Sequence, residues 1–307
     1  MPRLIKPRAI ERGACIGIAA PGGPVDPEKL AGGEALLQAA GFETLRRDDL
    51  LARQGYLAGD DARRAAELME LVANPRVDAI FCARGGYGCD RILEALDAAA
   101  VRAARKPLVG YSDVTALLLW QRRCAGLVGF HGPMLENGAA LAPEALESLV
   151  AALSGSAPIP TRLTGVGRAG TVADGRLVGG NLMLVASSLG TRWEVDTRGA
   201  ILLIEEVGER PYRIDRMLQQ LRSAGKLAAL VGVGVGDLSG CVDERYPLPS
   251  AEDVIEEIVR PLGVPLVTGL PMGHVPANRT WPVGARATID AKRGEIRILE
   301  HGVQRAQ

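Results

Sequence analysis

Three residues whose side chains could together perform acyl transfer are spread along the chain: Ser112, Glu205 and His274. A serine hydroxyl becomes a nucleophile when a base within reach takes its proton, and a carboxylate usually holds that base in place. The order Ser, Glu, His along the chain is also the order found in many serine hydrolases. Order alone is weak evidence, so the segments around each residue have to support the chemistry.

The segment around Ser112 predicts a sharp turn between a strand and a helix. The apolar run 107–109 favours a buried strand, and 113–121 has the apolar periodicity of a helix. Such a turn lifts a hydroxyl out of the sheet toward a helix N-terminus, where N–H groups favour a developing negative charge. The motif is Gly-Tyr-Ser-Asp rather than Gly-x-Ser-x-Gly. The alternative is that Ser112 only caps the helix, as serine commonly does.

Glu205 follows the fully apolar run 201–204, which predicts a buried strand. The carboxylate is then either a surface charge at the exit of the strand or a group placed for chemistry. Glu206 stands beside it, and the alternation of side chains along a strand should send the two carboxylates to opposite faces.

The chain has three histidines, of which His274 is the best candidate base. It lies in the loop 271–279, which is too rich in proline and glycine for a core element, so it is either exposed or placed for chemistry. His131 follows an apolar run and either lines the site or caps a turn. His301 lies in a polar tail, where solvation is expected.

The first half of the chain alternates between strand and helix patterns, which predicts a doubly wound parallel sheet of the Rossmann or flavodoxin-like class. The expected strands are 14–20, 42–46, 77–83, 107–109 and 127–130. The expected helices are 27–40, 90–96, 113–121 and 143–153, with one more that Asp60 or Asp61 caps and Asn74-Pro75 ends. In such sheets ligands bind beyond the carboxyl ends of the strands, where the loops 21–24 and 84–88 and Ser112 all fall.

The segment 154–170 loses this pattern and is interpreted as a linker between domains 1–153 and 171–307. The second half predicts a smaller, mixed β/α domain. Its expected elements are a hairpin at 171–178, helices from 179, from 211 and at 251–259, and strands at 200–204, 227–235, 264–268, 286–290 and 295–299.

Composition excludes several classes of protein. Lys plus Arg and Asp plus Glu number 36 each among 307 residues, so no basic field favours nucleic acid or a membrane surface. No apolar run approaches a transmembrane span, and no signal-peptide pattern opens the chain. The five cysteines lack Cys-x-x-Cys spacing and predict reduced, mostly buried thiols in a cytoplasmic protein. Cysteines and histidines are too scattered for a zinc site, and no cofactor is expected.

Several motifs occur together and in a consistent order. They are Arg-Gly-Gly-Tyr-Gly at 84–88, Gly-Tyr-Ser-Asp at 110–113, Gly-Gly-Asn-Leu at 179–182, Ile-Glu-Glu-Val-Gly-Glu-Arg-Pro-Tyr-Arg-Ile-Asp-Arg-Met at 204–217, and Gly-His at 273–274. With the Ala-Ala-Pro-Gly turn at 19–22 and Pro-Val-Gly-Ala at 282–285, the chain resembles the LD-carboxypeptidases of serine peptidase family S66 over nearly its whole length.

This resemblance implies a triad in which Ser112 is the nucleophile, His274 the base and Glu205 the carboxylate that orients it. The Leu-Glu-Asp strand end of the family is here Ile-Glu-Glu, and the first acidic position is the catalytic one, which favours Glu205 over Glu206. The resemblance also implies a site between two domains, a homodimer, and release of the terminal D-Ala from a murein tetrapeptide or its UDP-muramoyl form during cytoplasmic cell-wall recycling.

An oxyanion would be held by backbone N–H groups. The residue after the nucleophile, Asp113, is the natural first donor, and Gly85 and Gly86 are expected to supply the second. The glycine-rich loop could instead be only a tight turn. Arg84 is either a clamp for a substrate carboxylate or an ordinary ion pair.

Other functions remain open at this point. A branch of the same family cleaves aminoacyl-nucleotide antibiotics of the microcin C type, and tends to carry an additional loop with an aromatic residue near the site. Here the segment 180–205 is short and Trp193 is its only aromatic residue, which favours murein. More distant alternatives are a non-catalytic two-domain binding protein and a small-molecule kinase, because Gly-Gly-Tyr-Gly faintly resembles some kinase loops. Neither explains a serine on a turn with Glu205 and His274 downstream.

Overall fold

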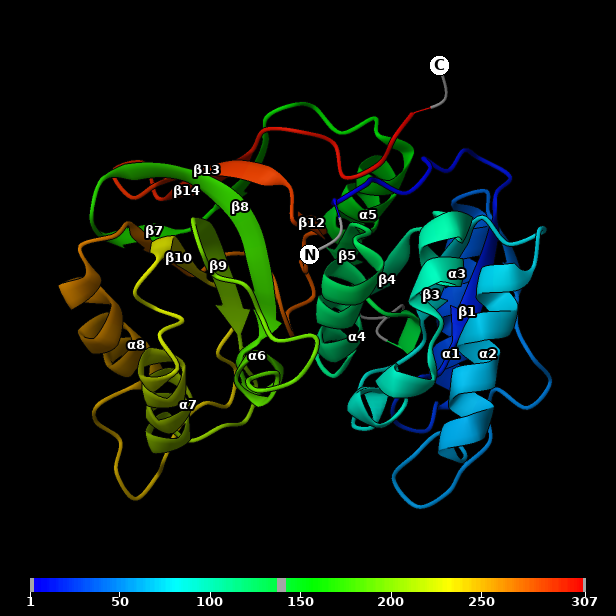
Figure 1. The fold of residues 1–307 in the computed structure, drawn as a ribbon, viewed down its shortest axis with the longest axis horizontal. Coiled ribbons are helices and arrows are strands. Elements are labelled where there is room, and N and C mark those ends of the chain that lie inside the picture. The colour runs from blue at the N-terminus through cyan, green and yellow to red at the C-terminus, as the bar shows by residue number, and fades with distance from the viewer. Residues whose placement is uncertain (1–2, 137–141, 306–307) are drawn as a thin grey trace.

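The computed structural model describes residues 3–136 and 142–305. They form two β-sheets that lie side by side, each with helices packed against it (Figure 1). Within these residues no helix combines the length and the apolar character that crossing a membrane requires.

The first sheet has the strand order β2-β1-β3-β4-β5-β12. Its strands are β1 (Cys15–Ala19), β2 (Glu43–Leu45), β3 (Ala79–Cys82), β4 (Leu108–Gly110), β5 (Gly129–His131) and β12 (Trp281–Val283). The first five are parallel and run in the order 2-1-3-4-5, which is that of flavodoxin-like folds. The expected fold class is confirmed. The sixth strand, β12, comes from the other end of the chain and pairs antiparallel with β5.

The helices of the first half are α1 (Pro27–Ala39), α2 (Asp61–Ala73), α3 (Ala98–Ala104), α4 (Val114–Trp120) and α5 (Pro143–Ser154). Asp60 caps α2 by accepting a hydrogen bond from the Arg63 N–H. The helix expected at 90–96 is wrong, because this stretch forms two 3₁₀ turns, η1 (Cys89–Arg91) and η2 (Leu93–Ala95). The helix begins later, after Asp97, whose carboxylate caps α3.

The second sheet has the order β6-β14-β13-β8-β9-β10-β11-β7. Its strands are β6 (Thr161–Thr164), β7 (Val166–Ala169), β8 (Val172–Asn181), β9 (Ala200–Glu205), β10 (Leu230–Val235), β11 (Leu266–Thr268), β13 (Arg286–Asp290) and β14 (Glu295–Ile298). The run β8-β9-β10-β11 is parallel and the outer pairs are antiparallel, so the sheet is mixed.

Two expectations for this half need correction. The hairpin expected at 171–178 is a single continuous strand, because β8 pairs with β13 on one side and with β9 on the other, which leaves no room for a turn. The segment 154–170, interpreted as an irregular linker, contains β6 and β7, which pair with β14 and β11.

Three helices, α6 (Leu182–Ser187), α7 (Pro211–Ser223) and α8 (Ala251–Val259), pack against the second sheet (Figure 1). A capping box between Ser250 and Asp253 begins α8. All five cysteines are free thiols, and all except Cys124 are buried, as the sequence predicts.

Candidate active site

Glu205 and His274 form a hydrogen-bonded pair. Glu205 is the last residue of β9 and is fully buried, and its Oε2 lies 2.8 Å from Nδ1 of His274. The neighbouring Glu206 turns to the other face, as strand alternation predicts, and accepts hydrogen bonds from the Asn181 Nδ2 at 2.9 Å and the Met183 N–H at 3.0 Å. Glu205 thus orients a histidine, whereas Glu206 tethers the start of α6.

The loop that carries His274 is held close to Glu205. Gly273 has a φ of +107°, and a Cβ there would lie 2.9 Å from the Cβ of Glu205, so only glycine fits both the backbone and the space. The N–H of Gly273 donates to Oδ1 of the buried Asn278 at 3.1 Å. Sequence reasoning did not single out Asn278, which fixes the turn that presents the histidine.

Ser112 lies on the turn between β4 and α4, and its backbone is strained. Its φ is +57°, a left-handed value that costs a residue with a Cβ about 1–2 kcal/mol. No side chain caps the N-terminus of α4, and the Thr115 N–H bonds to the backbone oxygen of Ser112 at 2.8 Å rather than to its hydroxyl. The helix-cap interpretation of Ser112 therefore has no support in the hydrogen bonds of the described residues.

Tyr111 brings the Ser112 turn and the His274 loop together. Its ring meets the ring of His274 edge-on, with 4.8 Å between centroids. Behind it, His131 is the last residue of β5, fully buried and stacked on Trp281 with ring centroids 5.0 Å apart. Burial, and then the charge of His274, lower the pKa of His131 to about 3. His131 is therefore a neutral packing residue in the sheet and does not cap a turn.

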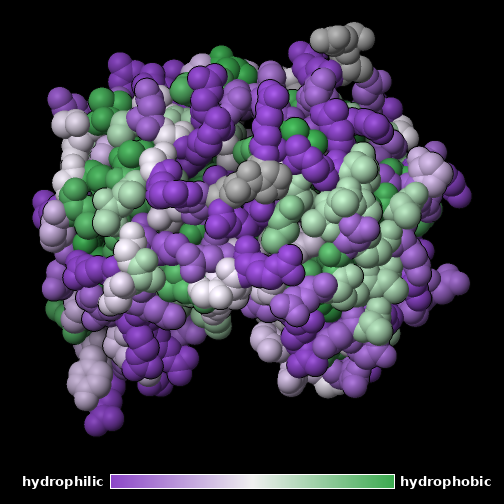
Figure 2. All heavy atoms as spheres, viewed as in Figure 1, coloured by the Kyte–Doolittle hydropathy of each residue, from purple (hydrophilic) through white to green (hydrophobic). Residues whose placement is uncertain are grey.

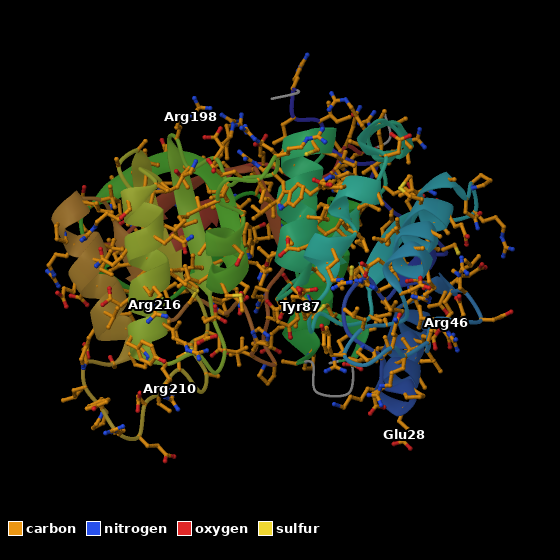
Figure 3. All side chains as sticks on the ribbon, turned by 60° about the horizontal axis from the view of Figure 1, so that its bottom comes forward. Glu28, Arg46, Tyr87, Arg198, Arg210 and Arg216 are labelled. Carbon is orange, nitrogen blue, oxygen red and sulfur yellow. The ribbon has the colours of Figure 1, made fainter. Side chains whose placement is uncertain are left out.

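The loop 84–88 packs directly on the Ser112 turn. A Cβ on Gly85 would lie 3.2 Å from the Ser112 Oγ and 3.3 Å from the backbone nitrogen of Asp113. The buried Asp113 carboxylate accepts a hydrogen bond from the Cys89 N–H at 2.9 Å, which ties the turn to the end of this loop. Tyr87 of the loop lies near the middle of the molecule, between the two halves (Figure 3).

The guanidinium of Arg84 is engaged within the protein. Its Nη1 donates to the Pro24 carbonyl at 2.6 Å, and its Nε lies 3.4 Å from a carboxylate oxygen of Glu136. The ion pair is therefore present, and the clamp for a substrate carboxylate stays a prediction. Arg84 remains 41% exposed, so the pair is a modest contribution to stability.

Replacing Gly85 by alanine tests whether this close approach matters. The new methyl group would press on Ser112 Cβ and Oγ, at 3.1 and 3.2 Å, and displace the hydroxyl. We expect kcat to fall by about 10- to 100-fold, because misplacing a reacting group by roughly 1 Å has that effect. The melting temperature should change little. Steady-state kinetics and thermal unfolding check both, and unchanged kcat would show that this contact leaves the serine in place.

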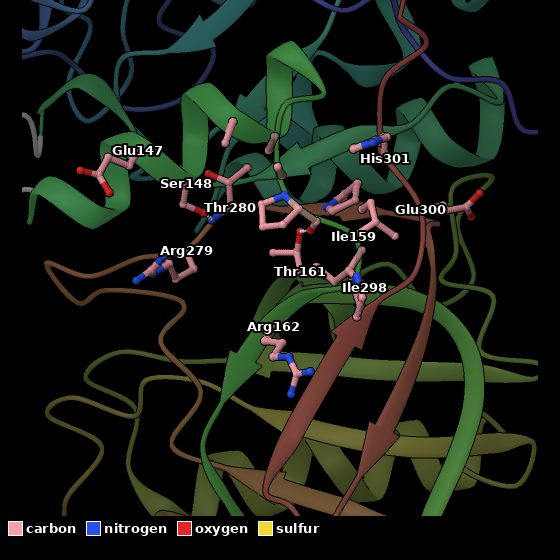
Figure 4. A pocket seen from close by; sticks show the side chains of 17 residues that line it. Glu147, Ser148, Ile159, Thr161, Arg162, Arg279, Thr280, Ile298, Glu300 and His301 are labelled. Carbon is pink, nitrogen blue, oxygen red and sulfur yellow. Dashed lines mark hydrogen bonds between the residues drawn. The ribbon is translucent and has the colours of Figure 1, made fainter.

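A cavity of about 540 Å³ lies between α5 and the ends of β6, β12 and β14 (Figure 4). Ser148, Thr161 and Thr280 are among its lining residues, whereas Ser112, Glu205 and His274 are not. The cavity is therefore separate from the candidate catalytic residues.

The first sheet thus carries a serine on the turn after its fourth strand, and the second sheet carries Glu205, which holds His274 of the loop between the two sheets. These are the residue types of a hydrolytic enzyme with a serine nucleophile. Two family models match the chain, one in each half. The LD-carboxypeptidase N-terminal domain matches residues 16–132, and the LD-carboxypeptidase C-terminal domain matches residues 174–289. The chain belongs to the LD-carboxypeptidase family, peptidase family S66, and is a peptidase.

Individual proteins are similar over most of their length. A probable murein peptide carboxypeptidase of Bacillus subtilis is 37% identical, covering 97% of this chain and 95% of the relative. The crystal structure of a muramoyltetrapeptide carboxypeptidase from Oxalobacter formigenes has a TM-score of 0.82 and 31% identity, covering 93% of this chain and 98% of that one. The microcin C7 self-immunity protein MccF of Escherichia coli is 27% identical, and the match covers 97% of this chain and 96% of that protein.

Proposed function

We propose that this protein is a serine LD-carboxypeptidase that releases the terminal D-Ala from murein tetrapeptides. The observation that carries the proposal is the 2.8 Å hydrogen bond between Glu205 and His274. It is supported by the 4.8 Å ring contact of His274 with Tyr111, the residue directly before Ser112. The names of the Bacillus and Oxalobacter relatives support the substrate class.

In the proposed mechanism, Nε2 of His274 takes the proton of Ser112 as the hydroxyl oxygen attacks the scissile carbonyl carbon. The tetrahedral intermediate collapses when the imidazolium gives this proton to the leaving amine of D-Ala, which leaves an ester on Ser112. Water, deprotonated by His274, then hydrolyses the ester and restores the serine. Glu205 keeps the proton of His274 on Nδ1, so that Nε2 is free to accept.

Backbone N–H groups would stabilise the oxyanion. The first N–H groups of a helix have no partner inside it, and the Asp113 N–H lies at the start of α4, directly after the serine. Gly85 approaches this nitrogen closely enough for its loop, with Gly86, to contribute a second donor. Arg84, which is 41% exposed beside this loop, remains the candidate clamp for a substrate carboxylate, with Pro24 and Glu136 positioning its guanidinium.

The pH dependence should follow His274. Burial by itself lowers the pKa of His274, but the hydrogen bond and charge of Glu205, together with the charges of Asp237 and Glu206, raise it above its usual value. Because only neutral imidazole accepts a proton, kcat/KM should rise with pH through this raised pKa. Replacing Asp237 by asparagine removes one negative charge and should move the acid limb to lower pH. A pH–rate profile that does not move would exclude Asp237 from tuning the base.

A second candidate function is cleavage of an aminoacyl-nucleotide amide, favoured by the 27% identity to the self-immunity protein. The same nucleophile and base would serve both reactions, so the substrate has to be tested directly. Between Gly180 and Glu205 only Trp193 is aromatic, and it is half-buried, which offers little stacking surface for a nucleobase.

The deciding experiment is mass spectrometry of a UDP-muramoyl tetrapeptide incubated with the protein. Loss of one alanine supports the LD-carboxypeptidase proposal. An intact tetrapeptide together with a cleaved aminoacyl-nucleotide would support the second function. The family resemblance also implies a homodimer in the cytoplasm, and sedimentation equilibrium checks the oligomeric state.

A further inference from the structure

A second cavity, of about 450 Å³, has four cationic side chains among its lining residues. It lies where the N-terminal segment meets the turn after α4 and the segments next to β5, β8 and β12 of the two sheets. Hydrophilic side chains gather along the middle of this face (Figure 2). The charged residues that line it are Arg3, Lys6, Arg122, Arg176 and Glu300. Four cations thus share the cavity with a single carboxylate.

The carboxylate of Glu300 already has partners within the protein. Lys6 lies 3.0 Å and Arg176 3.6 Å from the carboxylate oxygens of Glu300, which also accepts the backbone N–H of Arg286 at 2.8 Å. Burial raises the pKa of Glu300, but the Arg286 N–H and the neighbouring cations outweigh it and lower the pKa below its usual value. Glu300 is therefore negative at neutral pH and still balances only one of the four positive charges.

Arg122 is only weakly compensated by its surroundings. Its Nε is buried and has no hydrogen-bond partner among the described residues. Burial lowers the pKa of Arg122, and the charge of Asp196 only partly opposes this effect. An unpaired buried donor on a charged group costs free energy, which an anion placed in the cavity would recover. Arg122 lies in the π-helical turn η3 (Gln121–Ala125) that follows α4, and such turns are frequent at functional sites.

The cavity lies at the opposite end of both sheets from the candidate catalytic residues. Strand β5 begins directly after Val128, which lines the cavity. It ends at His131, which pairs with Gly110, two residues before Ser112. In the second sheet Arg176 pairs with Ala200 at the start of β9, whereas Glu205 ends that strand. A ligand in this cavity would therefore not occupy the peptidase site.

We propose that this cavity binds a small multiply charged anion through a phosphate or diphosphate group, held by the guanidinium groups of Arg122 and Arg176. Guanidinium pairs bidentately with phosphate oxygens, and the volume is that of a small-molecule site. A monocarboxylate would balance only one of the unmatched charges, whereas a diphosphate balances two or more. This inference does not rest on the LD-carboxypeptidase proposal.

Isothermal titration calorimetry with three probes tests it: inorganic phosphate, pyrophosphate and a nucleoside diphosphate. We expect at least one probe to bind the wild type, and Arg176→Gln and Arg122→Met each to raise its Kd by about tenfold or more. Arg176 is half exposed, so its variant should fold even if the Arg122 variant does not. The ranking of the three probes tells whether a nucleoside contributes.

Two controls make the result specific. Arg46→Gln removes a surface cation on the outer side of the first half and should leave the Kd unchanged (Figure 3). Ser112→Ala should also bind as the wild type does, and loss of binding in this variant would place the anion in the peptidase site and overturn the proposal. It is equally overturned if no probe binds, or if both cavity variants bind as tightly as the wild type.

Discussion

Replacing Ser112 by alanine is expected to lower kcat/KM for release of D-Ala by about 10⁴-fold or more, as the loss of a serine nucleophile does in other triads. Without the hydroxyl no acyl-enzyme forms, and only the oxyanion donors and substrate binding remain. The measurement is the rate of alanine loss from a UDP-muramoyl tetrapeptide by mass spectrometry. Full activity in this variant would remove Ser112 from the chemistry.

Two matched variants separate chemistry from folding. Ser187→Ala changes an exposed serine of α6 and should retain full activity. Ser112→Gly should be as inactive as the alanine variant, yet its free energy of unfolding should rise by about 1 kcal/mol, because glycine adopts the φ of +57° without strain. An inactive glycine variant that is also more stable cannot be explained by damage to the fold.

Replacing Glu205 by glutamine is expected to lower kcat by about 10³- to 10⁴-fold, in line with the corresponding change in other triads. The Glu205 Oε2 accepts the Nδ1 proton of His274 at 2.8 Å, whereas an amide could donate to Nδ1 and leave the proton on Nε2. The histidine would then be oriented but unable to accept a proton from Ser112. Single-turnover kinetics measure this loss, which should be smaller than that of His274→Ala by up to about 100-fold.

The neighbouring Glu206→Gln is the matched control. Its carboxylate is buried and accepts hydrogen bonds from Asn181, Met183 and Val207, so the substitution should reduce the free energy of unfolding. Its kcat should stay within about tenfold of the wild type, because the hydrogen bonds of its carboxylate in the described part of the chain go to Asn181, Met183 and Val207. If Glu206→Gln lost as much kcat as Glu205→Gln, the two carboxylates would not have distinct roles.

The sequence predicts the parts of the site that depend on local pattern. An apolar run followed by a turn and a helical period locates Ser112 between β4 and α4, and a second apolar run locates Glu205 at the end of β9. Strand alternation correctly separates Glu205 from Glu206. Each of these features involves neighbours in the chain, whose side-chain directions follow from the geometry of one element.

The features that depend on distant residues could not be read in the same way. Strand β12 is only three residues long and contains Pro282, so it shows no strand period, and its partner β5 is far away in the chain. The contact of Tyr111 with His274 exists only after the two sheets meet. The hairpin expected at 171–178 failed for a related reason, since Asp174 and Gly175 pair with strand β13.

The path of the chain through β12 constrains how this protein could be divided. The loop with His274 leaves the second sheet at β11 and enters the first sheet at β12, so it is anchored at both ends in different sheets. A fragment cut after α5 would lack the outer strand of its own sheet and expose β5 as an unpaired edge, which invites aggregation. Complementation between two co-expressed fragments would therefore restore solubility and the alignment of His274 in a single step, as β12 docks on β5.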